Sequence, residues 1–167
     1  MKQAFEITDK KIIQNFFDRA EYGTLALCAD GLPYSFSVVE SYSLLPSYFS
    51  NTEGLACPAT QFFKSIIIDG EAVVVESREE KAKMFEALMQ KLQPESQYRS
   101  FDEEAYDKVL KATAVIKIVP AETRAKFKFG QHLNEERFDM IIKHLKERGE
   151  VLDLETVSLM EQYYAVR

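Results

Sequence analysis

The stretch GTLALCADGLPYS at residues 23–35 decides the fold class of this chain. Two runs that favour β-strands flank the dipeptide Asp30-Gly31, a preferred sequence for a tight hairpin turn. A second stretch, KSIIIDGEA at residues 64–72, places another Asp-Gly after a β-branched run, and the apolar pattern then resumes. The two stretches predict antiparallel strands that are joined or bent at Asp-Gly.

The surrounding segments predict helices and further strands. A helix is expected from Thr8 or Asp9 to a stop at Gly23. Strands are expected at residues 24–29, 34–42, 48–51, 65–68, 72–77, 113–119 (ended by Pro120) and 124–129. Further helices are expected between Ser77 and Pro94, at 102–111, between Asn134 and Gly149, and at 154–164 after the cap Asp153. Short strands interrupted by helices predict an α+β fold, a β-barrel decorated with helices.

Composition narrows the classes of function. The 167 residues, 46% hydrophobic and 29% charged, are typical of one soluble domain. A net charge of −6 argues against general nucleic-acid binding, which needs a basic surface. The N-terminus has no signal-peptide core and no apolar stretch is long enough to span a bilayer, so a cytoplasmic protein is expected. Cys28 and Cys57 are therefore expected to be reduced thiols.

The order of the segments resembles the FMN-binding split barrels of the pyridoxamine 5'-phosphate oxidase-like superfamily, especially its nitroimidazole-reductase-like branch. The resemblance covers about residues 8–131. Its segments are the hairpin at 23–34, Tyr48-Phe49, Glu53-Gly54, residues 65–70, Gln93-Pro94-Glu95, Tyr98-Arg99, the strand at 115–118 and KFKFGQ at 126–131. It implies an antiparallel split β-barrel with peripheral helices. Residues 1–131 would form the barrel domain with inserted helices, and residues 132–167 a C-terminal helical extension packed on the barrel.

The resemblance implies a bound FMN. This cofactor needs an anion site for its phosphate, hydrogen bonds for its ring edges and an apolar shelf for its isoalloxazine. The expected cofactor-binding residues are Tyr34, Ser35, Phe36, Ser37, Asn51, Thr52, Gly54, Lys64, Ser65, Lys126 and Lys128. Residues 34–37, 64 and 65 stand where the family faces its flavin. The loop at 51–54 could bind phosphate through backbone amides, or could be an ordinary turn.

Residues 124–129 alternate cations with apolar side chains. In a strand, Arg124, Lys126 and Lys128 share one face. That face could receive a flavin phosphate at a dimer interface, or it could protect an edge strand from aggregation. The serines on the strand at 34–42 could likewise let a planar ring approach the backbone, or could simply face solvent.

The chain departs from the family pattern in the loop after residue 48. Ser50 stands where the family has a histidine, and Ala56 stands where it has a lysine that helps to neutralise the flavin phosphate. Only residues 55–64 connect this loop to the next strand, too few for the further strand that family members carry there. We therefore expect a barrel that is trimmed at its cofactor edge.

Two functions follow as hypotheses. The first is an FMN-dependent oxidoreductase, a homodimer that reduces a small oxidised substrate with electrons from a nicotinamide donor. The alternative is a non-catalytic binding or regulatory module that has lost FMN binding and uses its C-terminal helices for a partner. A flavin-related regulator that binds DNA ranks third, because the net charge is negative. No pattern identifies a catalytic residue, and His132 and His144 lack further ligands at metal-binding spacing, so no metal site is expected.

Overall fold

The computed structural model describes residues 3–26 and 34–165 of the chain. Part of the predicted first hairpin, including Cys28 and the turn at Asp30-Gly31, lies outside these residues. Within them, no helix is both long and apolar enough to cross a membrane.

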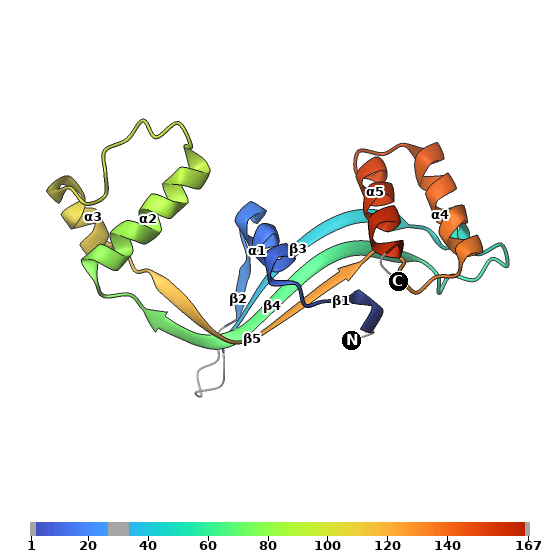
Figure 1. The fold of residues 1–167 in the computed structure, drawn as a ribbon, viewed down its shortest axis with the longest axis horizontal. Helices are drawn as coiled ribbons and strands as arrows, with labels where there is room; N and C mark the ends of the chain where they lie inside the picture. Colours follow the sequence, from blue (N-terminus) through green and yellow to red (C-terminus); the bar gives the residue numbers. More distant parts are fainter. Residues whose placement is uncertain (1–2, 27–33, 166–167) are drawn as a thin grey trace.

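The fold is built on one five-stranded antiparallel sheet with the strand order β1-β5-β4-β3-β2. Its strands are β1 (Glu6–Ile7), β2 (Thr24–Ala26), β3 (Tyr34–Leu45), β4 (Thr60–Val74) and β5 (Ile116–Lys128). Figure 1 shows β4 and β5 as long curved strands that run through the length of the molecule, with β3 beside β4 only from the middle toward the end that carries α4 and α5. The central strand β4 pairs with β3 along one edge and with β5 along the other.

The helices are grouped at different parts of this sheet. They are α1 (Lys10–Arg19), α2 (Arg78–Leu92), α3 (Asp107–Ala112), α4 (Glu135–Arg148) and α5 (Asp153–Tyr164), with short 3-10 helices at Gln3–Phe5, Ser47–Phe49 and Glu104–Tyr106. In Figure 1, α4 and α5 lie at one end of the sheet, α2 and α3 lie at the other, and α1 lies over the middle. This arrangement of an antiparallel sheet with peripheral helices is the α+β split-barrel type predicted from the sequence.

Three predicted helix starts are confirmed by their capping contacts. The carboxylate of Asp9 accepts hydrogen bonds from the amides of Lys11 (2.7 Å) and Ile12 (3.3 Å). The side chains of Ser77 and Asn134 accept amide hydrogen bonds at the starts of α2 and α4. These side chains satisfy amides that the first helical turn leaves without a partner.

Two predicted helix ends are wrong. The first helix ends at Arg19, not at Gly23. Gly23 instead lets the chain before β2 pass close to β3, because a Cβ at this position would overlap the ring of Phe36 and the carbonyl of Ser37. Asp153 is not an N-cap but the first residue of α5, and its carboxylate binds Arg148 and the amide of Glu150.

The prediction that Pro120 ends a strand is also wrong, because β5 continues through it to Lys128. A proline lacks the amide hydrogen that a central strand needs, but among the described strands β1 flanks β5 only at Ala125 and Lys126. Pro120 therefore lies on an edge. It stands opposite Gly70, where the register between β4 and β5 shifts by one residue of β5, and a Cβ on Gly70 would overlap the carbonyl oxygen of Val119. The predicted bend at Asp69-Gly70 is confirmed as this shift.

The predicted strand at residues 48–51 is wrong as well. Pro46 follows β3, and the chain then forms the 3-10 helix at residues 47–49, which buries Phe49 in the core. The segment from 50 to 59 is loop, and β4 begins at Thr60. The described chain therefore has no strand between β3 and β4, as the short connection predicted.

The hydrophobic core lies on one face of the sheet. Alternate residues of the long strands, such as Val38, Ile66 and Phe127, pack with side chains of α1, α4 and α5. On the opposite face Val39 is 59% exposed. The period-two alternation of a strand separates the two faces, so each residue's position along its strand decides which environment it meets.

Candidate functional site

The side of the sheet opposite the hydrophobic core carries five of the residues predicted to bind a cofactor. We call it the open face. It consists of three cross-strand rows: Ser37, Ile67 and Arg124; Val39, Ser65 and Lys126; and Ser41, Phe63 and Lys128. Ser35 extends the β3 column and stands opposite Asp69. The predicted residues Ser35, Ser37, Ser65, Lys126 and Lys128 therefore share one surface, with serines on β3 and cations on β5.

Two other predicted residues lie on the core side instead. Phe36 packs against the hydrophobic core, and Lys64 is buried, whereas its neighbour Ser65 belongs to the open face. Adjacent residues of a strand point to opposite faces, so Lys64 and Ser65 do not form one flavin-facing pair. Tyr34 begins β3 opposite Gly70, and its side chain lies outside what the structure describes.

The cations of the open face contact neighbouring groups. The ammonium of Lys126 lies 5.2 Å from the ring centre of Phe63 and 5.8 Å from that of Phe5. Lys128 donates a hydrogen bond to the hydroxyl of Thr60. These contacts hold both ammonium groups near the sheet surface, so the strand end presents fixed positive charge.

A hollow of about 420 Å³ lies between the loop at residues 50–59, the end of the sheet and α4, and Lys128 is the open-face residue that lines it. We call it the end hollow. Its polar lining residues include Ser50, Asn51, Glu53, Thr60, Lys128, His132 and Arg137. The side-chain oxygen of Asn51 accepts the Glu53 amide at 2.7 Å, which folds the loop at residues 51–55 into a tight turn. Asn51 and Lys128, both predicted as cofactor residues from distant segments, thus meet in one hollow.

The other predicted loop residues border this hollow without lining it. Thr52 and Gly54 are exposed, and Gly54 takes a positive φ of 76° that favours glycine. The loop therefore approaches the end hollow through Asn51 and Leu55. Its turn agrees with both interpretations given for it, an ordinary turn and one wall of a binding site.

The segment after β5 and the first turn of α4 bring a histidine and an arginine to the end hollow. Gly130 reverses the chain with a φ of 82°, and Gln131 ties the turn to β5, accepting from the Phe129 amide and donating to the Phe127 carbonyl. This turn places His132 in the hollow, and the first turn of α4 adds Arg137. Neither residue is predicted from the sequence as a cofactor ligand, because neither belongs to a local pattern and only the fold brings them together.

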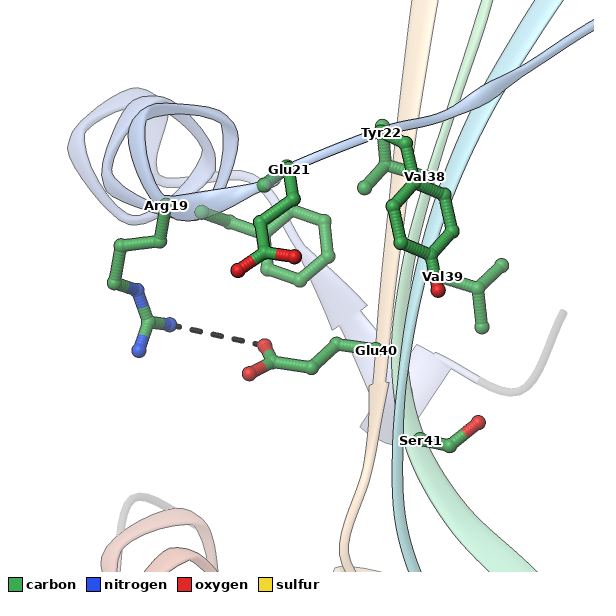
Figure 2. Close-up of a pocket in the computed structure, with 9 residues that line it drawn as sticks. Arg19, Glu21, Tyr22, Val38, Val39, Glu40 and Ser41 are labelled. Carbon is green, nitrogen blue, oxygen red and sulfur yellow. Dashed lines mark ion pairs between the residues drawn. The ribbon is translucent and has the colours of Figure 1, made fainter. Parts of the chain in front are cut away.

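Figure 2 shows a different hollow, of about 330 Å³, between the end of α1 and β3. Here the pairing of β2 with β3 stops at Ser37, and the edge of β3 continues alone. Arg19 points toward Glu40 across the hollow, with the two charged groups 3.8 Å apart. None of the predicted cofactor residues lines it.

Comparison with known proteins agrees with this fold. Residues 48–127 match the family model described as pyridoxamine 5'-phosphate oxidase. The flavocytochrome Anf3 from Azotobacter vinelandii has a similar structure, with a TM-score of 0.60 and 14% sequence identity over 77% of this chain and 72% of that chain. No curated protein matches the sequence. Both matches support the split-barrel superfamily of pyridoxamine 5'-phosphate oxidase that the sequence order predicted. Its assignment to the nitroimidazole-reductase-like branch stays a prediction.

Proposed function

We propose that this protein binds FMN, with the phosphate in the end hollow and the isoalloxazine ring on the open face. The observation that carries the proposal is the meeting of the Asn51 loop with Lys128, Arg137 and His132 in one hollow. Cationic side chains and loop amides are the groups that bind a phosphate. Glu53 also lines this hollow and opposes an anion, so the cations must outweigh it.

Lys128 connects the two parts of the proposed site. It lines the end hollow and also ends a row of the open face. Lys126 lies two residues earlier on the same face, about 7 Å along the strand. An extended ligand with its phosphate at Lys128 would therefore reach the row of Val39, Ser65 and Lys126. Val39 offers an apolar shelf there, and the small Ser65 leaves room for a flat ring.

The finer proposal is a flavin-dependent oxidoreductase that acts on a small oxidised substrate with a nicotinamide donor. When bound, FMN supplies the hydride chemistry, and the protein supplies binding, orientation and electrostatics. The serine hydroxyls of the open face would orient the ring, and the cations would hold its anionic end. This division of work explains why the sequence has no recognisable acid–base pair.

We further propose that two chains form a homodimer. Among the described strands, only β4 and β5 continue beyond Gly70, and they form a two-stranded ribbon that carries α2 and α3 away from the other helices (Figure 1). Val73, Val74, Ile116 and Val119 are exposed on this ribbon. An isolated two-stranded ribbon is marginally stable in water, so a second chain that covers the face of Val74 and Ile116, which stand directly opposite each other, would stabilise it.

The second candidate function is a non-catalytic module of the same fold. Ala56 in place of the phosphate-binding lysine, together with the carboxylate of Glu53 in the end hollow, favours it. A visible absorption spectrum followed by titration with FMN separates the two candidates. Saturable quenching of flavin fluorescence supports the flavin-binding proposal. A colourless protein that leaves FMN fluorescence unchanged at millimolar concentration supports the non-catalytic module.

A further inference from the structure

Lys64 has an unusual environment on the core side of the sheet. Its side chain is only 5% exposed, and its ammonium lies 4.8 to 5.9 Å from the ring centres of Tyr42, Phe127 and Phe129. Among the described residues it donates one hydrogen bond, to the Tyr42 hydroxyl at 2.6 Å, and lies 3.9 Å from the carboxylate of Glu40. An ammonium carries three donors, so this buried group has capacity for a further partner.

A hollow of about 530 Å³ gives Lys64 access to such a partner. We call it the Lys64 hollow. It lies between α1 and α5, with Phe16, Phe127, Leu159 and Tyr163 among its lining side chains. Asn15, Asp18, Glu155 and Gln162 are exposed residues that form its rim. The arrangement is an apolar pocket with one buried amine at its wall and polar groups at its mouth, which is typical of a small-molecule site.

The charges around the Lys64 hollow favour a neutral ligand over an anion. Arg19 lines the hollow beside Lys64, but the carboxylates of Asp18 and Glu155 line it as well, and Glu40 is close to the ammonium. An anionic ligand would meet these carboxylates. A carbonyl oxygen accepts hydrogen bonds without carrying a charge, so a carbonyl compound with an apolar body fits both the amine and the walls.

We propose that Lys64 is the nucleophile of a second site, in which a small aldehyde or ketone enters the hollow between α1 and α5 and forms a reversible imine with Nζ. The site lies on the opposite face of the sheet from the proposed flavin site and does not depend on it. Burial lowers the pKa of Lys64, and Glu40 acts in the opposite direction. A lower pKa increases the share of neutral amine, the form that attacks a carbonyl.

The reaction needs no oxidant or reductant. The lone pair of Nζ forms a bond to the carbonyl carbon, the carbonyl π electrons move to oxygen, and that oxygen takes a proton to give a carbinolamine. The C–O bond then breaks, water leaves with a second proton, and the nitrogen lone pair forms the C=N bond. Overall, one ammonium and one carbonyl give one protonated imine and one water. Tyr42, 2.6 Å from Nζ, is positioned to relay these protons, and Glu40 lies close enough to stabilise the positive imine.

Reductive trapping tests this proposal on the full chain. The protein is incubated with benzaldehyde and sodium cyanoborohydride, which reduces the imine to a stable benzyl amine, and the labelled lysines are quantified by peptide mass spectrometry. Lys64 is expected to be labelled faster than the exposed Lys108 and Lys143, because burial lowers its pKa and increases its share of neutral amine. Its labelling should also saturate with benzaldehyde concentration. Labelling of Lys64 that is no faster than that of the exposed lysines overturns the proposal.

Variants that retain Lys64 separate a site from a merely reactive amine. Leu159→Trp fills the hollow and should abolish the selective labelling, whereas Leu154→Trp, on the same helix but outside the lining, should leave it unchanged. Tyr42→Phe should slow the labelling and change its pH profile. The charged and titratable groups that face the Lys64 ammonium and the hollow are Glu40, Arg19, Asp18, Glu155 and Tyr163. Circular dichroism checks that each variant is folded. Equal labelling of Lys64 in the folded Leu159→Trp variant and in the native protein rejects the hollow as the site. An unchanged FMN titration in the same variant shows that the two sites are independent.

Discussion

The guanidinium of Arg148 forms two hydrogen bonds with the carboxylate of Asp153, from Nε at 2.9 Å and from Nη2 at 2.6 Å. Arg148 ends α4, and Asp153 begins α5 and has a side chain that is only 1% exposed. The same carboxylate accepts from the Ser43 hydroxyl at 2.6 Å, and the Arg148 guanidinium donates to the Leu44 carbonyl at 2.9 Å. This buried network therefore joins both C-terminal helices to β3.

Replacing Asp153 should destabilise the protein strongly. Asp153→Asn removes the negative charge that pairs with the Arg148 guanidinium and weakens the hydrogen bond that the Ser43 hydroxyl donates. Removing one partner of a buried ion pair costs about 3 kcal/mol of unfolding free energy. Urea unfolding followed by circular dichroism measures the loss. The matched control is Glu103→Gln, which breaks the exposed pair with Arg99 and should leave the midpoint unchanged. Equal effects of the two substitutions would contradict a structural role for the Asp153 network.

The same network predicts how stability depends on pH. The Arg148 hydrogen bonds lower the pKa of Asp153 from 3.8 to about 2. Because the folded state holds the ionised form, this stabilisation is complete above about pH 4 and is lost as the pH falls toward 2. Its size is about 2 kcal/mol. Thermal unfolding midpoints measured between pH 5 and pH 2 should fall less steeply in Asp153→Asn, which lacks this titration. Parallel pH curves for the two proteins would show that Asp153 does not titrate in this way.

Features that depend on a few neighbouring residues could be predicted from the sequence. The helix starts after Asp9, Ser77 and Asn134 were predicted correctly because a cap is a contact between residues two or three apart. Pro120 was misjudged because the effect of a missing amide depends on whether a strand lies beside it. Only the sheet order shows that this part of β5 is an edge.

The site shows the same limit. Lys128 was predicted from the alternation of residues 124–129, and the structure confirms a strand up to Lys128. The same alternation in β4 places Lys64 and Ser65 on opposite faces. Arg137 could not be predicted as a neighbour of Asn51, because their segments are 86 positions apart and meet only through the packing of α4. Local patterns identify candidate groups, and the tertiary fold decides which of them meet.

The close approach at Gly70 gives a second stability prediction. Gly70→Ala adds a Cβ that would overlap the carbonyl oxygen of Val119, so β4 or β5 must shift. We expect a loss of about 2 kcal/mol, typical of steric strain at a special backbone position. Glu71→Ala is the control, because Glu71 is exposed and is the next residue of the same strand. Chemical unfolding compares the two, and a Gly70→Ala protein as stable as its control would mean that the ribbon adapts without strain.

The proposed dimer predicts a specific effect of charge on the ribbon. Val74 is 58% exposed there, and Val74→Glu would place a carboxylate in the proposed interface. We expect light scattering at micromolar concentration to give the mass of two chains for the native protein and of one chain for this variant. Val151→Glu changes a 97% exposed valine at the other end of the molecule and should remain dimeric. A native mass of one chain, or dissociation of both variants, would remove the ribbon as the interface.

The flavin site predicts that charge reversal in the end hollow weakens FMN but not riboflavin, which lacks the phosphate. Lys128→Glu and Arg137→Glu each replace attraction with repulsion at the proposed phosphate position. A lost charge-assisted contact is worth about 1.5–3 kcal/mol, which corresponds to about a tenfold to hundredfold rise in Kd. Fluorescence titration of both ligands measures this rise.

The control for charge alone is Lys108→Glu, on α3 at the opposite end of the molecule, which should bind both ligands like the native protein. Unfolding midpoints of all three variants check that the reversal at Lys128 does not act by losing its contact with Thr60. If Arg137→Glu weakens FMN and riboflavin equally, the phosphate does not lie in the end hollow. The selective loss of FMN would instead place it there, because the two ligands differ only in the group that these cations are proposed to bind.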